Sequence, residues 1–394
     1  MPTSLPADLA SAITERICRV TGGGRVALHE PSFQGNEAAY VQDCISTGWV
    51  SSVGSYVDRF ERDLAEVTGA AHAVVVSNGT SGLQVALQLA GVRASDEVII
   101  PALSFVATAN AVMHCGATPH FADSEYASLG LGVPALADHL ASIIETRNGV
   151  SVNRHTGQRI GAIVPMHTFG HPVDMPALMG LAQRYGIAVV EDAAESLGSL
   201  IGGRHTGTHG LCAMLSFNGN KIVTTGGGGA IITNDAALAK RAKHLTTTAK
   251  QPHPWAFFHD EVGYNFRLPN LNAALGCAQL EQLAGFVAAK RELAQRYADA
   301  LQDVPGVALF TERAGTRANY WLQTLILDAD VADQRDAILA STNAAGQMTR
   351  PVWELLSTLP MYAACPGMDT PVARDLARRI VNLPSSPQLV QGAA

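Results

Sequence analysis

The sequence predicts an α/β fold in which helices cover both faces of a mainly parallel, seven-stranded sheet. Between residues 57 and 240, short apolar runs of strand length alternate with longer stretches of helical pattern. Such alternation is typical of parallel sheets covered by helices. Polar residues follow several of these runs, and active sites in such sheets gather at the carboxyl ends of the strands. The expected strands are 73–76, 98–100, 118–121, 162–165, 187–190, 212–217 and 229–233.

The chain has 394 residues, more than a single core usually holds, so we expect a large and a smaller domain. Residues 1–30 are predicted to form a helix and a linker, with glycines 22–24 ending the helix. Residues 31–265 would form the large domain, and 266–394 a smaller C-terminal α/β domain with strands near 307–310 and 321–327. A long helix is expected from Leu271 to Tyr297. Its predicted buried stripe comprises Leu275, Leu280, Leu283, Phe286 and Leu293.

Composition narrows the class of protein. Apolar residues make up 47% and charged residues 15%, which is typical of a well-packed globular enzyme. The net charge of -7 argues against a nucleic-acid binder. The 6 cysteines are far apart and show no zinc-ligand spacing, so we expect no metal site and reduced thiols in a cytoplasm. No apolar run is long enough to predict a membrane span, and the N-terminus lacks the pattern of a secretory signal.

Lys221 is the first candidate catalytic residue. It lies in LSFNGNKIVTTGGGGAIIT (215–233), where small polar residues and glycines precede and follow it. This setting offers the lysine no core to be buried in, and the strand-like run 229–233 would hold the segment rigidly. We therefore interpret Lys221 as a lysine placed to react, for example by forming a Schiff base with a carbonyl group.

Two further segments complete a pattern. The apolar run 187–190 ends in Glu191 and Asp192, which places carboxylates where a buried strand would emerge. The run 73–76 leads into SNGTSG and a helical pattern, and a helix N-terminus of this kind favours an anion such as phosphate. A reactive lysine, an acid for a pyridinium nitrogen and a phosphate cup are the requirements of pyridoxal 5′-phosphate (PLP).

On these and neighbouring stretches the chain resembles the sugar aminotransferases of the DegT/DnrJ/EryC1/StrS family. This resemblance implies an aspartate aminotransferase-like (type I PLP) fold. The matching stretches follow the family's order over most of residues 30–290. They are GWVSSVGSYVDRFERDLAEVTGA (48–70), VVVSNGTSGLQVAL (74–87), DEVIIPALSFVATANAV (96–112), VPMHTFGHPVDM (164–175), VVEDAAESLGS (189–199), LSFNGNKIVTTGGGGAIIT (215–233) and HDEVGYNFRLPNLNAALGCAQLEQL (259–283).

The resemblance implies roles for the residues around the cofactor ring. Lys221 would carry PLP as a Schiff base and then move the proton between the two reacting carbons. Asp192 would keep the pyridine nitrogen protonated. Glu195 resembles a polar residue near the phenolic oxygen, but a carboxylate beside a phenolate is costly unless it is protonated or bonded elsewhere, so its role stays open. Phe105 matches an aromatic residue stacked on the ring.

Other residues are expected to bind the phosphate and to contact a second subunit. Gly79, Thr80 and Ser81 are the expected phosphate cup, and Ser216 resembles a serine that also binds the phosphate. The loop with Asn265 would reach the active site of a second subunit and complete its phosphate site, which implies a homodimer.

Four residues are candidates for substrate contacts. Arg267 could bind the carboxylate of the amino donor, with Arg350 as its rival. His167 stands with His171 at a turn after a strand, where contact with substrate and a structural role are equally open. His259 follows an aromatic cluster that could wall the substrate entrance or serve only packing.

The expected reaction is a transamination in two halves. Glutamate would convert PLP to pyridoxamine phosphate (PMP), whose amine then passes to a nucleotide-linked 4-keto-6-deoxy sugar for surface glycan biosynthesis. Within the family, the strings most resemble enzymes that make UDP-4-amino-4,6-dideoxy-N-acetylglucosamine for legionaminic acid or bacillosamine. That resemblance suggests UDP-2-acetamido-2,6-dideoxy-4-keto-hexose as substrate, and glycine at position 227 supports this branch.

Several alternatives stay open or are disfavoured. The substrate could instead be a GDP- or dTDP-linked 3- or 4-keto sugar. A PLP-dependent sugar dehydratase would have histidine in place of Lys221, and a Rossmann dehydrogenase would need the GxGxxG spacing that the chain lacks. An inactive PLP-binding regulator is a further class, although no DNA-binding element is apparent.

Overall fold

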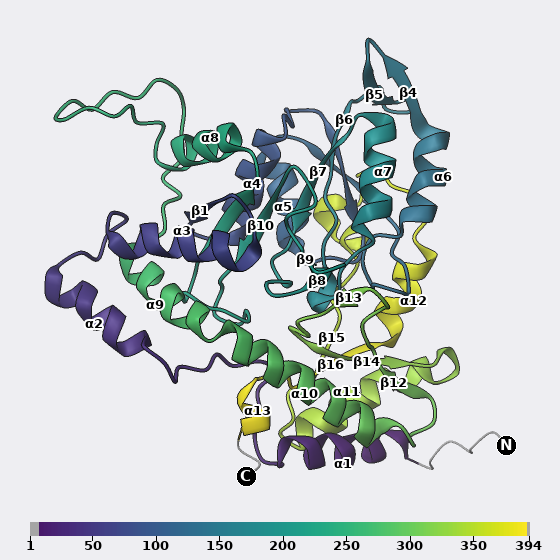
Figure 1. The fold of residues 1–394 in the computed structure, drawn as a ribbon. Coiled ribbons are helices and arrows are strands. Elements are labelled where there is room, and N and C mark those ends of the chain that lie inside the picture. Colours follow the sequence, from purple (N-terminus) through teal and green to yellow (C-terminus); the bar gives the residue numbers. More distant parts are fainter. Residues whose placement is uncertain (1–7, 392–394) are drawn as a thin grey trace.

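A seven-stranded sheet forms the centre of the molecule in the computed structural model, which describes residues 8–391 (Figure 1). The strand order is β1-β11-β10-β7-β6-β2-β3. β11 is antiparallel to both of its neighbours, and the other adjacent pairs are parallel. All seven runs expected from the sequence are strands of this sheet, so the predicted fold class is confirmed. The strands are β1 (His72–Val76), β2 (Glu97–Pro101), β3 (Thr118–Ala122), β6 (Ile160–Ile163), β7 (Ala188–Asp192), β10 (Cys212–Ser216) and β11 (Gly229–Thr233).

Helices bury both faces of this sheet. Successive residues of a strand enter different cores, as the period of two requires. In β2, Val98 and Ile100 belong to the larger core, whereas Ile99 belongs to a second core beneath α6 and α7. The helices along this half of the chain are α2 (Glu37–Thr47), α3 (Ser55–Thr68), α4 (Gly79–Leu89), α5 (Val106–His114), α6 (Val133–Ile143), α7 (Met175–Tyr185) and α8 (Ala236–Thr246).

A smaller four-stranded sheet, ordered β12-β14-β16-β15, forms the other end of the molecule. The N-terminal helix α1 packs there, because Ile13 and Ile17 share a core with Leu293 and Leu325. The helix expected within residues 1–30 is therefore α1, and it packs against the C-terminal elements. The elements are α1 (Leu9–Thr21), α10 (Leu283–Leu301), β12 (Val307–Leu309), β14 (Gln323–Leu327), α11 (Arg335–Ala344), β15 (Arg350–Pro351), α12 (Pro371–Arg379), β16 (Ile380–Leu383) and α13 (Gln388–Gln391).

The expected helix from Leu271 to Tyr297 is two helices, α9 (Asn270–Glu281) and α10. Gln282 separates them with a φ of -101°. Of the predicted stripe, Leu275 is only half-buried and the other four residues are buried. The domain boundary at residue 265 stays a prediction.

Short elements connect these parts. They are β4 (Ile144–Arg147), β5 (Val150–Asn153), β8 (Leu200–Ile201), β9 (Arg204–His205), β13 (Thr316–Arg317) and the 3-10 helices η1 (Thr168–Gly170), η2 (Ala329–Gln334), η3 (Leu356–Thr358) and η4 (Pro360–Tyr362). Among residues 8–391, no helix combines the length and the apolar character that crossing a membrane requires.

Candidate active site

A cavity of about 340 Å³ opens where β7 and β10 end and α4 begins. The site residues predicted from the sequence that line it are Gly79, Thr80, Phe105, Asp192, Glu195, Ser216 and Lys221. Residues that are far apart in the sequence therefore meet at the carboxyl edge of the large sheet. Other polar or aromatic lining residues are Asn78, Asn218, Asn220, Trp321 and Trp353.

Lys221 enters this cavity from the loop between β10 and β11. Its Nζ lies 3.2 Å from Oε1 of Glu195 and 3.9 Å from the centre of the Trp321 ring. The Trp321 indole is held in turn, because its Nε1 donates to the carbonyl oxygen of Asn220 at 2.7 Å. The amino group thus has a defined position between a carboxylate and an aromatic face.

Asp192 ends strand β7 and is buried. Oδ2 accepts a hydrogen bond from the Thr108 hydroxyl at 2.8 Å, and Oδ1 accepts one from the backbone N–H of Ala194 at 3.2 Å. Burial raises the pKa of this carboxyl, although these hydrogen bonds and the charge of Lys221 act in the opposite direction. The side chain is thus a buried acid at the cavity wall.

Glu195 lies three residues further on and is also buried. Oε2 accepts a hydrogen bond from the backbone N–H of Phe169 at 2.9 Å, while Oε1 faces Lys221. Burial raises the pKa of Glu195 to about 7, against the opposing charge of Lys221. Phe169 has a φ of 55°, in the left-handed region that is uncommon outside glycine. A carboxylate beside a phenolate is costly unless it is protonated or bonded elsewhere. The hydrogen bond that the Phe169 N–H donates and the ion pair with Lys221 provide such bonds for Glu195.

The first turn of α4 approaches the end of β10 closely. A side chain at position 79 would place its Cβ 2.9 Å from Sδ of Met214 and 3.2 Å from Cβ of Ser216, so glycine is required there. Asn78 caps the helix by accepting a hydrogen bond from the backbone N–H of Ser81 at 2.8 Å. Ser81 does not line the cavity, and the cap already uses its N–H. Of the residues predicted to bind the phosphate, Gly79, Thr80 and Ser216 line the cavity, and their role stays a prediction.

Aromatic side chains form the remaining wall. Phe105, 48% exposed, lies at the N-cap of α5 with its ring centre 6.1 Å from that of Trp353. Trp321 and Trp353 also line the cavity, but the sequence did not predict them as site residues. No local signal distinguishes these residues. From the sequence Trp321 is expected to begin a strand, and Trp353 follows the short edge strand β15.

Besides Ser81 and His167, four predicted residues lie outside this cavity in the same chain. Asn265 is exposed and accepts a hydrogen bond from Nε of Arg267. His259 is exposed, and its Nδ1 lies 2.7 Å from the carbonyl oxygen of Thr248. Arg350 is exposed on β15. Roles for these residues in binding substrate or a second subunit stay predictions.

His167, for which the sequence left a substrate contact and a structural role equally open, lies away from the cavity. It is fully buried and does not line the cavity. Nε2 lies 3.0 Å from Oε2 of Glu191, and Nδ1 accepts a hydrogen bond from the backbone N–H of Val173 at 3.2 Å. Both ring nitrogens are occupied, which favours the structural role of the two that the sequence left open. His171 is likewise buried, away from the cavity, against Phe310.

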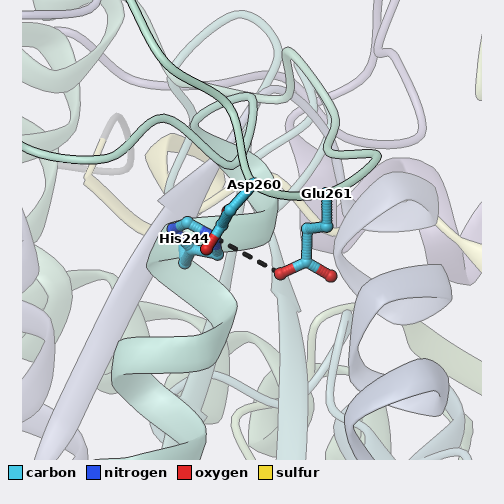
Figure 2. A group of neighbouring side chains, drawn as sticks. All are labelled: His244, Asp260 and Glu261. Carbon is cyan, nitrogen blue, oxygen red and sulfur yellow. Dashed lines mark hydrogen bonds and ion pairs between the residues drawn. The ribbon is translucent and has the colours of Figure 1, made fainter.

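The long loop after α8 projects from the molecule in Figure 1 and is anchored at its base by charged groups. His244 lies 2.8 Å from Oδ1 of Asp260 and 3.3 Å from Oε1 of Glu261 (Figure 2). These three could offer ligand atoms to a metal ion. Arg241, however, binds both carboxylate oxygens of Glu261. The guanidinium supplies the positive charge there, so we interpret the group as an ion-pair network that fixes the loop.

The residues in the cavity fit PLP. Gly79 and Thr80, in the first turn of α4, line the cavity, and at a helix N-terminus donors and the helix dipole favour an anion such as phosphate. A buried acid stands at the position of Asp192, and a single amine at that of Lys221. When bound, PLP supplies a carbonyl that reacts with amines and a ring that takes up electrons. The chain supplies an amine, a buried acid and aromatic walls around the cavity.

Comparisons with known proteins agree with this arrangement. Residues 31–394 match the DegT/DnrJ/EryC1/StrS aminotransferase family. The chain is 35% identical to a GDP-perosamine synthase of Vibrio cholerae, over 92% of this chain and 95% of that protein. It is 32% identical to a UDP-N-acetyl-3-dehydro-alpha-D-glucosamine 3-aminotransferase of Acidithiobacillus ferrooxidans, over 86% and 85%.

A solved structure shares the whole fold. The aminotransferase TlmJ from Streptoalloteichus hindustanus superposes with a TM-score of 0.82 at 30% identity, covering 92% of this chain and 94% of that one. Family, relatives and fold agree with the chemistry of the cavity. The chain therefore belongs to the DegT/DnrJ/EryC1/StrS aminotransferase family and is a PLP-dependent aminotransferase of nucleotide sugars.

Proposed function

We propose that the enzyme transfers the amino group of glutamate to a nucleotide-linked 4-keto-6-deoxy sugar, with UDP-2-acetamido-2,6-dideoxy-4-keto-hexose as the preferred acceptor. The observation that carries the proposal is the position of Lys221, whose amine lies 3.2 Å from Glu195 in a cavity that Asp192 also lines. One amine and two buried acids around one pocket are what an exchange of an amine for a ketone requires.

Each acidic or basic group has a separate task in this proposal. Lys221 takes the proton from the carbon that bears the donor's amine and returns it to the acceptor's carbon. Asp192 keeps a proton on the ring nitrogen of the cofactor, because a buried carboxylate stabilises a neighbouring cation strongly. Glu195 binds the amine of Lys221 while that amine is free, and its pKa of about 7 lets it share the proton near neutral pH.

Two nucleotides are candidates for the acceptor sugar. The segments around Lys221 and Asn265 resemble those of UDP-4-amino-sugar enzymes, which supports UDP and a product for legionaminic acid or bacillosamine. A GDP-linked acceptor is the second candidate, since a relative at 35% identity is named GDP-perosamine synthase. Both candidates use the same groups in the cavity.

A second subunit belongs to the proposal. Asn265 is exposed and Arg267 is half-buried, and both lie after the long loop and outside their own chain's cavity. Large apolar side chains nearby are exposed to solvent, including Trp255 at 80% and Phe257 at 81%. Exposed apolar surface of this kind favours burial against a partner. We therefore expect a homodimer in which the Asn265 loop completes the partner's phosphate site, in a cytoplasmic enzyme.

The test compares acceptors directly. Purified enzyme is incubated with glutamate and, in turn, UDP-, GDP- and dTDP-linked 4-keto-6-deoxy sugars and 3-keto sugars, and the amino sugars are quantified by mass spectrometry. The preferred acceptor should give a kcat/KM at least about tenfold above the others. A higher value for a GDP-linked acceptor would replace the UDP proposal. Loss of the PLP absorbance change with glutamate would remove the amino-donor part.

A further inference from the structure

A second cavity shares a wall with the catalytic one. It has a volume of about 350 Å³, and Asn220, Trp321 and Trp353 line both cavities. Its remaining polar lining residues are His29, Arg350 and Asn382. Arg350 was a candidate from the sequence for binding the donor's carboxylate, whereas His29 and Asn382 have no task in the transamination described above. Trp321 and Trp353 thus form a wall between the catalytic groups and a separate polar pocket.

His29 is the first reason to regard this pocket as a binding site. Both of its ring nitrogens are buried, and neither has a hydrogen-bond partner among residues 8–391. A buried polar atom without a partner costs about 1–3 kcal/mol, so such atoms usually meet a ligand, an ion or water. The chain around the ring is fixed on both sides: the carbonyl of Leu28 accepts from the N–H of Ser385 at 2.7 Å, and the N–H of Glu30 donates to Oγ of Ser386 at 2.8 Å. The backbone that carries the imidazole is therefore held on both sides of His29.

Positive charge is the second reason. Nη1 of Arg350 donates to Oδ1 of Asn343 at 3.0 Å and to the carbonyl oxygen of Thr349 at 2.8 Å. These acceptors are neutral, so they orient the guanidinium without compensating its charge. Burial, and then the charges of Lys290 and Lys221, lower the pKa of His29 well below its usual value. The pocket therefore combines a neutral imidazole with a positive environment, which favours an anion.

The catalytic cavity creates the need for such a site. Among its lining residues, Lys221 is the only lysine or arginine, and the cofactor uses its amine. Both substrates of the proposed function are nevertheless anions: the amino donor has carboxylates, and the nucleotide sugar has a diphosphate. A cation for either group has to come from outside the cavity, and Arg350 lies in the pocket next to it.

We propose that the second cavity binds the anionic oxygens of a substrate, with Arg350 supplying the charge and His29 and Asn382 the hydrogen bonds. The proposal rests on the proposed function, because it places the reacting carbon beside Lys221 and the anionic end beyond Trp321 and Trp353. Carboxylate and diphosphate share this chemistry, so the experiment has an arm for each. An arginine suits both, since its planar guanidinium can bind two oxygens at once.

The kinetic arms use the holoenzyme and follow the two half-reactions separately by cofactor absorbance. Arg350→Met should raise the half-saturating concentration of one substrate about 10–100-fold, the range expected for a charged hydrogen bond, and leave the other substrate within about twofold. Arg350→Lys should recover most of the loss because it keeps the charge. The matched control is Arg378→Met, which removes an arginine from α12 that pairs with Asp333. A shift for glutamate identifies the carboxylate, and a shift for the keto sugar identifies the diphosphate.

Binding without chemistry provides an independent readout. Calorimetric titration uses glutarate, a dicarboxylate without the reactive amine, and free UDP and GDP. Arg350→Met and His29→Phe should each weaken the same one of these ligands, and His29→Phe tests the pocket without removing charge. Unchanged affinities and unchanged half-reactions in both variants would overturn the proposal. If the wild type binds an anion through Arg350 but glutamate does not convert its cofactor, the proposed function fails and the anion site stands.

Discussion

Glu191 and Asp192 are neighbours in the sequence but belong to two different regions on either side of strand β7. Glu191 faces a fully satisfied structural network. It accepts hydrogen bonds from the backbone N–H groups of Gly207, His209 and Gly210, each at 2.7 Å, and pairs with His167. Burial alone would raise its pKa, but the bonds to His167 and to these N–H groups hold the pKa below its usual value.

The other side of β7 is less satisfied. Asp192 has two hydrogen-bond donors, Thr108 and Ala194, and its pKa is raised by burial. Glu195, in the same region, has its pKa raised to about 7. The residues at and just after the end of β7 thus include one carboxyl with a lowered pKa and two with raised pKa values. Burial alone therefore does not make a carboxylate catalytic. What matters is whether protein donors already occupy its oxygens or leave them available to a ligand.

The largest expected effect is on activity, at Asp192. In the proposed function Asp192 keeps the proton on the cofactor's ring nitrogen, so Asp192→Asn should lower kcat by at least about 10³-fold. The apoprotein should stay as stable as the wild type or become more stable, since its buried carboxyl has a raised pKa. Single-turnover absorbance with glutamate measures the first effect and urea unfolding the second. A stable variant with nearly full activity would show that Asp192 is structural.

The opposite result is expected on the other side of the strand. Glu191→Gln leaves three backbone N–H groups without their anion, and the free energy of unfolding should fall by about 3–5 kcal/mol. The folded fraction should still transaminate, because Glu191 does not line the cavity. The measurement is the urea midpoint, with the exposed Glu66→Gln as control. Equal midpoints for the two variants would remove the contrast between the two regions.

Local patterns were sufficient to predict most of the fold and part of the site. The seven strands follow from apolar runs. Asp192 ends strand β7 and Lys221 lies in the loop that follows β10, where small and polar residues mark the edge of the sheet. The break at Gln282 has no glycine or proline to announce it, so the two helices read as one.

Other features depend on residues that are distant in the sequence. Trp321 and Trp353 reach the cavity only through tertiary packing, and no spacing could reveal them. His167 could be assigned only once Glu191 was seen to occupy Nε2. The tasks of Asn265 and Arg267 depend on a second chain, so they stay predictions.

The pH dependence of stability should differ in sign between the two regions. The pKa of Glu195 in the folded state is about 7, above its ordinary value of 4.5, so its ionisation opposes folding. Cofactor-free enzyme should lose up to about 3 kcal/mol of stability from this residue between pH 4.5 and 7, and nothing further above pH 7. Glu191, with a lowered pKa, stabilises the fold above pH 4.5 and loses this contribution as the pH falls.

Two variants separate these contributions. Glu195→Gln should flatten the loss between pH 4.5 and 7, whereas Glu191→Gln should be most destabilised at the upper end of that range. Urea unfolding at half-unit pH intervals gives both curves. Parallel curves for the two variants would mean that the two carboxyls titrate alike, against the contrast drawn from their hydrogen bonds.

The smallest effect tests how weakly Asp192 is held. Thr108→Val removes one of its two donors, and the net worth of such a hydrogen bond to a charged group is about 1.5–3 kcal/mol. Since Asp192 remains in place through Ala194, kcat should fall about tenfold and its acidic limb should move to higher pH, because the lost bond favours the ionised carboxyl. Ser104→Ala, which removes only the hydroxyl 2.8 Å from Thr108, should have a smaller effect on both. If Thr108→Val left the pH profile of kcat unchanged, the carboxyl would be fixed by something other than its two donors, and the contrast with the four donors of Glu191 would lose its functional meaning.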